Sequence, residues 1–537
     1  MAFELVRTVA RIPRAVWDAG VLRPVRPDRA VRLPLQYVRY GATPGTVEAV
    51  AALRFPDRTA VLDDRGALTH RELEDRVAAL ATALRDLVHT GGEDRVGVLC
   101  RNHRGFLEAV LAASRLGTDV VLLNTDFSAR QLGEVAAREG VGLLVHDQEF
   151  DGVVDESGFA GRRVHAWRDD PDGKHESIDD LVAATAAEPH KPSRTSRVII
   201  MTSGTTGPPK GARHDLGPAM LLPAALTHMM RVPLRSGAPL AVAPPLFHLL
   251  GMAYCFAGLA LGMPLILTRR FDAARLTRLM AEHDAAALVA VPVMLERLLD
   301  VPDGPRPASL RTVVCGGAAL QPHLSSRFMD AFGDVLVNIY GATETGWATI
   351  ATPADLRAAP GTVGRPSLGL TIRILDEDGT ELPQGEIGEI YTGGGLRFTG
   401  YTGGGSKRVR DGLTGSGDLG HFDADGRLFV DGRADDMIVS GGENVFPGEV
   451  EDLLAAHPDV AEATVRGVDD DDFGQRLAAW IVPRDGASLT ADAVRDHVRH
   501  HLARYKVPRD VHFVRALPRT STGKIRSRDL TSPPPQQ

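Results

Sequence analysis

The stretch Met201-Thr-Ser-Gly-Thr-Thr-Gly-Pro-Pro-Lys-Gly211 combines glycines, hydroxyl side chains and one lysine directly after the apolar run Val198–Ile200. This composition favours a loop that holds phosphate groups through backbone N–H donors and a positive charge. A Walker A loop would need glycine directly before its lysine and serine or threonine directly after it. Here Pro209 precedes Lys210 and Gly211 follows it, so one N–H donor and the hydroxyl ligand for magnesium are missing. The sequence therefore predicts a phosphate-holding loop that does not open a helix.

The chain around this loop alternates short apolar runs with amphipathic segments over residues 50–350. Strands are predicted at 95–100, 119–124 and 142–146, and helices near 103–116 and 128–139. Such alternation is typical of βαβ units, which build parallel sheets covered by helices on both faces. Open sheets of this kind bind ligands just beyond the carboxyl ends of their strands. We therefore expect an α/β fold whose large N-terminal domain contains βαβ-type sheets.

From about residue 360 the pattern changes to alternating residues with Asp-Gly and Gln-Gly turns, which predicts a small β subdomain. Helices near 447–456 and 490–504 then indicate a smaller α+β C-terminal domain. The expected organisation is an N-terminal arm over 1–49, a large domain over 50–434 with its β-rich subdomain at 360–434, a C-terminal domain over 435–530 and a disordered tail over 531–537.

The composition excludes several classes of protein. At 537 residues the chain is too long for one core, and 43% hydrophobic with 24% charged residues is ordinary for a soluble globular protein. A formal net charge of −8 argues against nucleic acid as a partner. The three cysteines are far apart and offer no disulfide framework, which fits a reducing cytoplasm.

Two segments bear on membrane contact. Residues 1–32 carry seven arginines and a rough apolar stripe, which is compatible with peripheral contact to the inner face of a membrane or with an ordinary docking arm. No signal peptide is expected, because Arg7, Arg11 and Arg14 interrupt any apolar core. The apolar segment Leu249–Met263 is too short to span a bilayer comfortably, so we expect a buried helix beside a substrate cavity.

Four further segments accompany the glycine-rich loop, each with an ordinary structural interpretation when taken alone. They are "NIYGATETG" (338–346), "SGDLG" (416–420), "GRADDMIVSGGENVFPGEVE" (432–451) and "PRTSTGKI" (518–525). The first of them is expected to place Tyr340, Thr343 and Glu344 on a loop after a strand. In this order and spacing the five segments closely resemble the adenylate-forming superfamily, which contains acyl-CoA synthetases, luciferases and peptide-synthetase adenylation domains. The resemblance covers roughly residues 50–527.

The resemblance implies roles for individual residues in the first half-reaction. The loop from Thr202 to Lys210 would hold the pyrophosphate end of ATP, with Thr202 and Glu344 as the Mg²⁺ ligands. Asp418 would accept the ribose hydroxyls, and Lys524 would bridge the substrate carboxylate and the α-phosphate. The implied catalytic residues are Lys524, Glu344, Thr343 and His248. The implied nucleotide-binding residues are Thr202, Ser203, Gly204, Thr205, Thr206, Gly207, Lys210, Gly316, Gly317, Ala318, Tyr340, Gly341, Ala342, Thr343, Asp418, Arg433 and Lys524.

The same resemblance implies a second half-reaction in which a smaller, mobile C-terminal domain rotates about the hinge residue Asp435. Its coenzyme A residues would be Ser440, Gly441 and Gly442. The acyl pocket would contain Phe247, His248, Gly251, Met252 and Gly346, with His248 gating access; a buried structural histidine is the other interpretation of His248. Adenylation domains for amino acids usually carry Phe-Asp where this chain has Phe247-His248, so an amino-acid substrate is disfavoured.

The motifs "SGGENVFPGEVE" and "STGKIR" look most like those of bacterial fatty acyl-CoA ligases, and an apolar helix suits a long acyl chain. The predicted function is ATP-dependent activation of a medium- or long-chain fatty acid to acyl-AMP, followed by transfer to coenzyme A. The alternatives are a ligase that loads a carrier protein, a coenzyme A ligase for an aromatic or other carboxylic acid, and a non-enzymatic binder. Ser416 stands where many relatives carry threonine, but Asp418 is retained.

Overall fold

The computed structural model describes residues 12–21, 23–88, 95–170, 173–188, 190–202, 210–215, 218–302, 307–342, 346–394, 397–402, 407–434, 436–440, 443–470, 474–520, 523–526 and 529–530. The chain divides into two compact units. The first comprises Met1–Cys315 with Gly395–Ser406, and the second comprises Gly316–Gly394 with Lys407–Gln537. Each unit is described by itself below.

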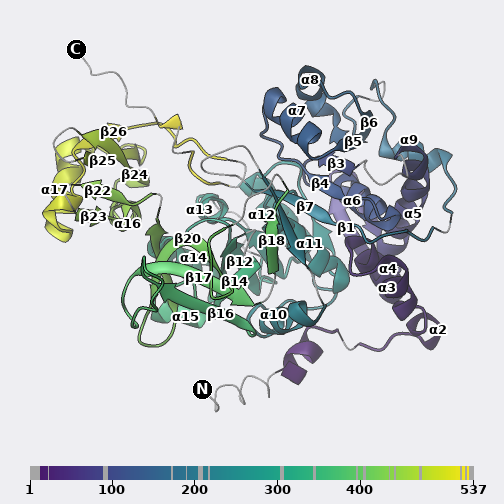
Figure 1. Cartoon of the computed structure of the whole chain (residues 1–537), viewed down its shortest axis with the longest axis horizontal. Coiled ribbons are helices and arrows are strands. Elements are labelled where there is room, and N and C mark those ends of the chain that lie inside the picture. The colour runs from purple at the N-terminus through teal and green to yellow at the C-terminus, as the bar shows by residue number, and fades with distance from the viewer. Residues whose placement is uncertain are drawn as a thin grey trace. The chain divides into compact units, whose positions relative to one another are not determined.

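The first unit contains a seven-stranded sheet of order β18-β8-β7-β4-β3-β5-β6. The strands from β7 to β6 in this order run parallel, whereas β8 runs antiparallel to both of its neighbours, β7 and β18. The predicted strand–helix rhythm is confirmed, and Figure 1 shows α7 and α8 beside each other near β5. The bounds are β3 Arg95–Leu99, α6 Arg104–Leu116, β4 Val120–Leu122, α7 Ala129–Arg138, β5 Val141–Asp147, α8 Asp151–Glu156, β6 Arg162–Trp167, α9 Ile178–Ala184, β7 Val198–Thr202, β8 Lys210–Asp215 and β18 Arg397–Tyr401.

A second sheet of the first unit has the order β12-β11-β9-β10-β1-β2, parallel except for β2. The bounds of these strands and of the other helices of the first unit are α2 Pro27–Ala30, α3 Leu33–Tyr40, α4 Pro44–Arg54, β1 Thr59–Asp63, β2 Gly66–Thr69, α5 His70–Leu87, α10 Pro218–Arg231, β9 Leu240–Val242, α11 Leu249–Ala260, β10 Leu265–Ile266, α12 Ala273–Glu282, β11 Ala287–Ala290, α13 Pro292–Leu299 and β12 Thr312–Gly316. The sequence dictates where α5 begins, because Thr69 and Glu72 form a reciprocal capping box.

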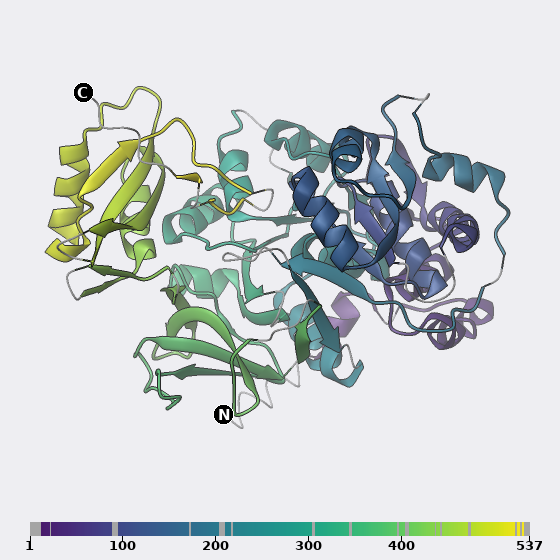
Figure 2. The same ribbon diagram turned by 45° about the horizontal axis from the view of Figure 1, so that its top comes forward.

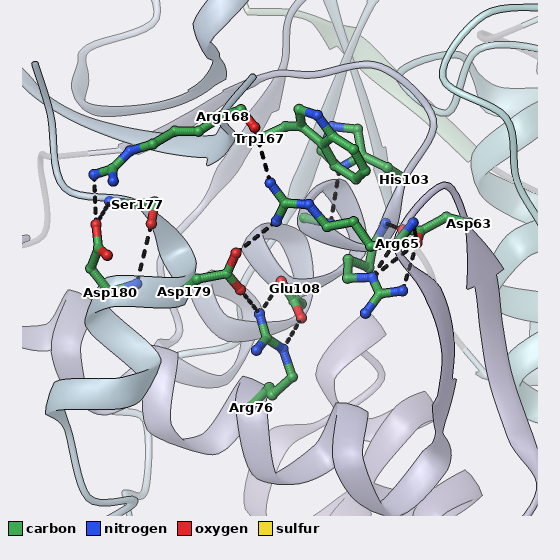
Figure 3. Close-up of polar contacts among 12 residues, drawn as sticks. Asp63, Arg65, Arg76, His103, Glu108, Trp167, Arg168, Ser177, Asp179 and Asp180 are labelled. Carbon is green, nitrogen blue, oxygen red and sulfur yellow. Dashed lines mark hydrogen bonds and ion pairs between the residues drawn. The ribbon is translucent and has the colours of Figure 1, made fainter. Parts of the chain in front are cut away.

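A polar network fixes α9 against α5 and α6 (Figure 3). Arg76 on α5 donates to Glu108 on α6 and, at 2.6 Å, to Asp179 on α9. Arg65 donates to the same Asp179 at 2.6 Å, and its guanidinium lies 3.9 Å from the ring centroid of Trp167. The Glu108 side chain is only 1% exposed, so its buried negative charge needs the guanidinium of Arg76 to compensate it. The network therefore holds the segment between β6 and α9 in place.

The second unit begins with antiparallel pairs β13–β14 and β14–β15 and continues as an antiparallel sheet of order β16-β17-β20-β19, with β21 paired to β20. The predicted antiparallel β structure after residue 360 is confirmed. The bounds are α14 Pro322–Phe332, β13 Leu336–Ala342, β14 Gly346–Ala351, α15 Pro353–Ala358, β15 Arg365–Pro366, β16 Leu370–Leu375, β17 Gly388–Gly394, β19 Val409–Arg410, β20 Leu413–Phe422 and β21 Leu428–Arg433.

The C-terminal part of the second unit has a hydrophobic core of its own, in which Val450, Leu477 and Val494 are buried together. Figure 2 shows α17 against the sheet of order β23-β22-β25-β24, to which β26 is added. Both predicted helices are present. The bounds are β22 Ile438–Ser440, β23 Glu443–Val445, α16 Pro447–Ala455, β24 Val460–Asp470, β25 Gly474–Pro483, α17 Ala491–His501 and β26 Asp510–Phe513. The proposed domain limits at 434 and 435 stay a prediction.

Among the described residues, no helix combines the length and the apolar character needed to cross a membrane. The apolar segment predicted as a buried helix is α11, with Tyr254, Cys255 and Leu259 fully buried. Residues 1–11 of the arm and the tail 531–537 lie outside the described residues. Trp17 and Val31 are each 70% exposed, and membrane contact by the arm stays a prediction.

Candidate nucleotide and acid sites

The glycine-rich loop joins two antiparallel strands. Thr202 at the end of β7 pairs with Lys210 at the start of β8, and Met201 pairs with Gly211. Because a strand follows the loop, the prediction that it does not open a helix is confirmed. The exposed Lys210 lies 5.5 Å from the ring centroid of Tyr401. The predicted phosphate-binding residues Ser203, Gly204, Thr205, Thr206 and Gly207, together with the side chain of Thr202, lie outside the described residues.

A carboxylate held by two partners lies in the second unit. Strand register places Asp418 on β20 opposite Arg433 on β21. Arg433 donates from Nη1 to Oδ1 of Asp418 at 3.0 Å, and the Tyr340 hydroxyl donates to Oδ2 at 2.6 Å. The structure thus brings Tyr340, which is 78 residues from Asp418 in the sequence, to the carboxylate that Arg433 holds from the neighbouring strand.

The expectation that Tyr340 lies on a loop after a strand is wrong. Tyr340 is part of β13, where it pairs with Thr349 of β14, because the antiparallel ladder continues to Ala342 and Gly346. Gly341 is required there, since a Cβ atom would lie 1.9 Å from the carbonyl oxygen of Gly346. The strand fixes the direction of the Tyr340 side chain more firmly than a loop would. Thr343 and Glu344 lie outside the described residues.

The charges and hydrogen-bonding groups of Tyr340, Asp418 and Arg433 suit the uncharged hydroxyls of a ribose. Burial, together with the charge of Asp418, raises the pKa of Tyr340 well above its usual range, so the phenol stays a proton donor. The Asp418 side chain is 15% exposed and that of Arg433 is 35% exposed. Each carboxylate oxygen has two acceptor positions and uses one of them here. Asp418 can therefore accept two further hydrogen bonds, as the two hydroxyls of a ribose would require.

Two residues that support Asp418 were not predicted as site residues. The Ser416 hydroxyl accepts from the backbone N–H of Asp418 at 3.0 Å, and Nζ of Lys407 donates to the Ser416 carbonyl at 3.2 Å. This hydrogen bond needs only a hydroxyl group, which serine and threonine both supply, so Ser416 can replace the threonine of many relatives. The rarity of lysine, with six in the chain, was the only sequence signal for Lys407.

The segment Gly316–Ala318 begins at the carboxyl end of β12. A Cβ atom on Gly316 would lie 2.9 Å from the carbonyl oxygen of Ile339, which explains the glycine. Gly317 has a φ of 82°, a left-handed conformation that disfavours other residues. The backbone of this predicted adenine-contacting segment is therefore close to β13, the strand of Tyr340.

Two residues predicted for the acyl pocket lie in the first unit. Phe247 and His248 directly precede α11, and their ring centroids are 4.4 Å apart. The loop before them is fixed by the buried Asn102. Its amide donates to the Pro244 carbonyl at 2.9 Å and accepts from the Leu246 N–H at 3.0 Å. Asn102 was not predicted, and its distance of more than 140 residues from its partners left no local signal.

Gly251 allows α11 to pack against this loop, since a Cβ atom there would lie 2.5 Å from the Pro245 carbonyl oxygen. We expect Gly251→Ala to displace Phe247 and His248 and to lower kcat/KM for the acid about tenfold or more, a loss of ~1.4 kcal/mol. The dissociation constant for ATP should stay unchanged, as measured by calorimetry. Gly152→Ala is the matched control, because that helical glycine has no atom within 4 Å. Equal losses in both variants would contradict this account.

A further polar pair lies between α10 and α11. The hydroxyl of the buried Tyr254 is 2.6 Å from Nε2 of His228. Desolvation lowers the pKa of His228 to about 4 and raises that of Tyr254 well above its usual range. The pair is therefore neutral, with Tyr254 as donor. A mostly apolar helix thus carries one buried polar contact next to the predicted acyl residues Gly251 and Met252.

In the C-terminal part, Lys524 lies on a tight loop with an exposed side chain. Its N–H donates to Oγ1 of Thr520 at 3.2 Å, and its carbonyl accepts from the Thr520 N–H at 2.8 Å. Ser440 pairs with Glu443 in the β22–β23 hairpin. The hinge residue Asp435 and the predicted coenzyme A residues Gly441 and Gly442 lie outside the described residues.

Comparisons with known proteins agree along most of the chain. The family model of the AMP-binding enzyme matches residues 49–402, and that of the AMP-binding enzyme C-terminal domain matches residues 449–524. A feruloyl-CoA synthase from Amycolatopsis sp is 35% identical over 480 residues, which cover 88% of this chain and 94% of that protein. An indoleacetate–CoA ligase from Aromatoleum aromaticum is 31% identical over 493 residues, which cover 89% of this chain and 94% of that protein.

A solved structure is similar as well. The o-succinylbenzoate CoA synthetase from Bacillus subtilis, in complex with its acyl-adenylate intermediate, matches with a TM-score of 0.79 and 28% identity over 91% of this chain and 98% of that one. The predicted fold, with a large N-terminal and a smaller C-terminal domain, is confirmed. So is the prediction of an AMP-forming acid–thiol ligase with ATP, Mg²⁺ and coenzyme A. With both family models and relatives above 30% identity across most of its length, the chain belongs to the AMP-binding enzyme family.

Proposed function

We propose that the chain converts an aromatic or aryl-substituted carboxylic acid to its coenzyme A thioester through an acyl-adenylate. The observation that carries this proposal is the 35% identity to a feruloyl-CoA synthase over 88% of the chain. The indoleacetate–CoA ligase supports the same class of acid. The fatty acid expected from the C-terminal motifs gains no support from these relatives, so the aromatic acid replaces it as the first candidate.

A fatty acid stays the second candidate, because α11 has no charged residue and would suit an alkyl chain. An alkyl chain has no use for polar groups, however, whereas a ring with hydroxyl or methoxy substituents needs them. The contact between Tyr254 and His228 supplies a neutral polar pair on this helix. This polar pair is a feature of α11 that an alkyl chain would not require.

In the proposed first step, an oxygen of the acid's carboxylate attacks the α-phosphorus of ATP and pyrophosphate leaves. The carboxylate is already ionised at neutral pH, so no general base is needed. Asp418, held by Arg433 and Tyr340, would orient the ribose. Lys524 would neutralise the charge that develops between the two anions. Magnesium, when bound, would stabilise the phosphate charges, with Thr202 and Glu344 as the proposed ligands.

In the proposed second step, the thiolate of coenzyme A attacks the carbonyl carbon of the acyl-adenylate and AMP leaves. The thiol proton passes to solvent, and the thioester bond replaces the mixed anhydride. We propose that the segment from Ser440 to Gly442 lies against the pantetheine chain in this step, because glycine-rich backbone permits a close approach. His248 is proposed to gate access between the two steps.

A panel of acids tests the proposal. Purified protein with MgATP and coenzyme A should convert ferulate or indoleacetate with a kcat/KM about 100-fold above that for octanoate or palmitate, a difference of ~2.7 kcal/mol. Products are identified by liquid chromatography and mass spectrometry. Faster conversion of octanoate or palmitate would favour the fatty-acid candidate. Formation of ADP in place of AMP would overturn the adenylation mechanism itself.

A further inference from the structure

A cluster of histidines lies in the first unit, outside every motif that accounts for the ligase reaction. His146 on β5 and His165 on β6 are register partners on neighbouring parallel strands, and their ring centroids are 5.0 Å apart. Both side chains have 0% exposure. Asp151 begins α8 next to them, and the ring centroid of His175 is 5.2 Å from that of His165. The fold thus gathers three imidazoles and one carboxylate.

The hydrogen bonds fix which nitrogen of each buried ring carries the proton. Nδ1 of His146 is 3.1 Å from the carbonyl oxygen of Asp147, which can only accept, so Nδ1 is protonated. Nε2 of His165 is 2.8 Å from Oδ1 of Asp151, so Nε2 is protonated. The other nitrogens, Nε2 of His146 and Nδ1 of His165, are buried and have no hydrogen-bond partner in the described part of the chain. Each ring therefore presents one unused lone pair.

Buried lone pairs of this kind are costly unless a ligand uses them. A backbone carbonyl or a carboxylate on the far nitrogen is the usual support of a metal-binding histidine. Oδ1 of Asp151 lies on the protonated side of both rings, 2.8 Å from Nε2 of His165 and 3.6 Å from Nδ1 of His146, so this carboxylate supports the rings from behind and is not itself a ligand. The ring centroid of His175 is 5.2 Å from that of His165 and 6.2 Å from that of His146. We propose that His146 and His165, through their unused nitrogens, and His175 bind one transition-metal cation of the Zn²⁺ class, with Asp151 as the carboxylate that supports His165.

The kind of ligand atom at this site determines which metal it prefers. Imidazole nitrogens suit zinc and its neighbours in the transition series, whereas Mg²⁺ prefers an all-oxygen shell. This site is therefore distinct from the magnesium of the ligase reaction. Burial also lowers the pKa of His146, which keeps that imidazole neutral and available as a ligand.

The loop that carries His175 is held without help from a metal. The guanidinium of Arg168 donates to the His175 carbonyl. It also donates, at 2.6 Å, to Asp180 on α9 (Figure 3). At its other end, Ser177 forms the capping box that begins α9. The His165 N–H also donates to the Glu176 carbonyl at 2.9 Å. The third imidazole is thus positioned in advance, which lowers the entropy cost of binding.

A second buried cluster shows what a purely structural arrangement looks like. His103 accepts at Nδ1 from the Gly105 N–H at 3.0 Å and donates from Nε2 to Asp147 at 2.8 Å. Both ring nitrogens are used, so the group of Cys100, His103 and Asp147 has no spare imidazole lone pair for a metal. The two unused nitrogens of His146 and His165 are what distinguish the proposed site.

A bound cation would join β5, β6, α8 and the loop before α9 at the edge of the sheet, where β6 is the last strand. Its binding free energy would add to the stability of the fold. We expect no direct part for it in the ligase reaction. The proposal does not depend on which acid the enzyme activates.

Metal analysis of the tag-free protein tests the proposal. After removal of bound metal with a chelator, titration with Zn²⁺ in the presence of excess Mg²⁺ should reach one equivalent per chain and raise Tm. Co²⁺ should give the visible absorption bands of a cation held by nitrogen ligands. Wild-type protein that takes up no Zn²⁺ under these conditions, or releases it to Mg²⁺, would overturn the proposal.

Variants locate the bound metal. His175→Ala and Asp151→Asn should each weaken Zn²⁺ binding about tenfold or more. His175 is only half-buried, so its variant should keep the fold, as judged by circular dichroism without metal. His283→Ala is the matched control, since it removes an exposed histidine at the end of α12 and should leave Zn²⁺ affinity unchanged. Equal affinity in all variants would place the metal elsewhere and refute the assignment.

Discussion

Lys524→Ala is expected to lower the rate of acyl-adenylate formation about 100- to 1,000-fold, equivalent to ~3–4 kcal/mol of transition-state stabilisation. The attacking carboxylate and the α-phosphate are both anions, and Lys524 is the proposed cation between them. Its exposed side chain projects from a loop closed by Thr520, so alanine removes the charge without disturbing the backbone contacts. ATP–pyrophosphate exchange in the presence of the acid measures this step alone.

The same variant should still convert supplied acyl-adenylate and coenzyme A to the thioester at close to the wild-type rate. We propose this separation because rotation about Asp435 would remove Lys524 from the active site before the second step. Lys506→Ala is the matched control, as a lysine of the same domain that pairs with Glu449. It should leave both half-reactions unchanged. If Lys524→Ala slows the two half-reactions equally, the rotation model is wrong for this protein.

Local structure could be predicted from the sequence because periodicity is a local property. The strand predicted at 95–100 is β3, and the helix predicted near 103–116 is α6, within one residue at most ends. The wrong placement of Tyr340 on a loop shows the limit. The length of β13 depends on pairing with β14, and a ladder of hydrogen bonds is not visible in one strand's own residues.

The supporting residues of the sites were missed for a related reason. Asn102 fixes the loop before Phe247, and Lys407 binds the Ser416 carbonyl, but neither has a recognisable spacing to its partner. His146 and His165 are likewise brought together only by the register of β5 and β6. The motifs identified the residues whose chemistry is shared across a superfamily. They could not identify the acid, since an apolar helix such as α11 suits an alkyl chain and an aromatic ring alike.

Asp418→Ala is expected to raise the dissociation constant for ATP about 100-fold or more. Hydrogen bonds to a charged group contribute ~1.5–3 kcal/mol each, and two ribose hydroxyls are proposed to donate to this carboxylate. The change also leaves Arg433 and the Tyr340 hydroxyl without their shared acceptor. Asp425→Asn is the matched control, because Asp425 is an exposed aspartate of the same subdomain that pairs with Arg427. Calorimetric titration with ATP measures both variants.

A second nucleotide shows whether the loss arises at the ribose. Wild-type protein should bind 2′-deoxy-ATP about tenfold more weakly than ATP, whereas Asp418→Ala should no longer distinguish the two, because the acceptor for the 2′-hydroxyl is gone. Tyr340→Phe should show an intermediate preference, since Asp418 keeps its charge but loses the 2.6 Å hydrogen bond that orients it. Equal binding of both nucleotides by the wild type would mean that Asp418 acts on the fold around β20 and β21 and not on the ribose.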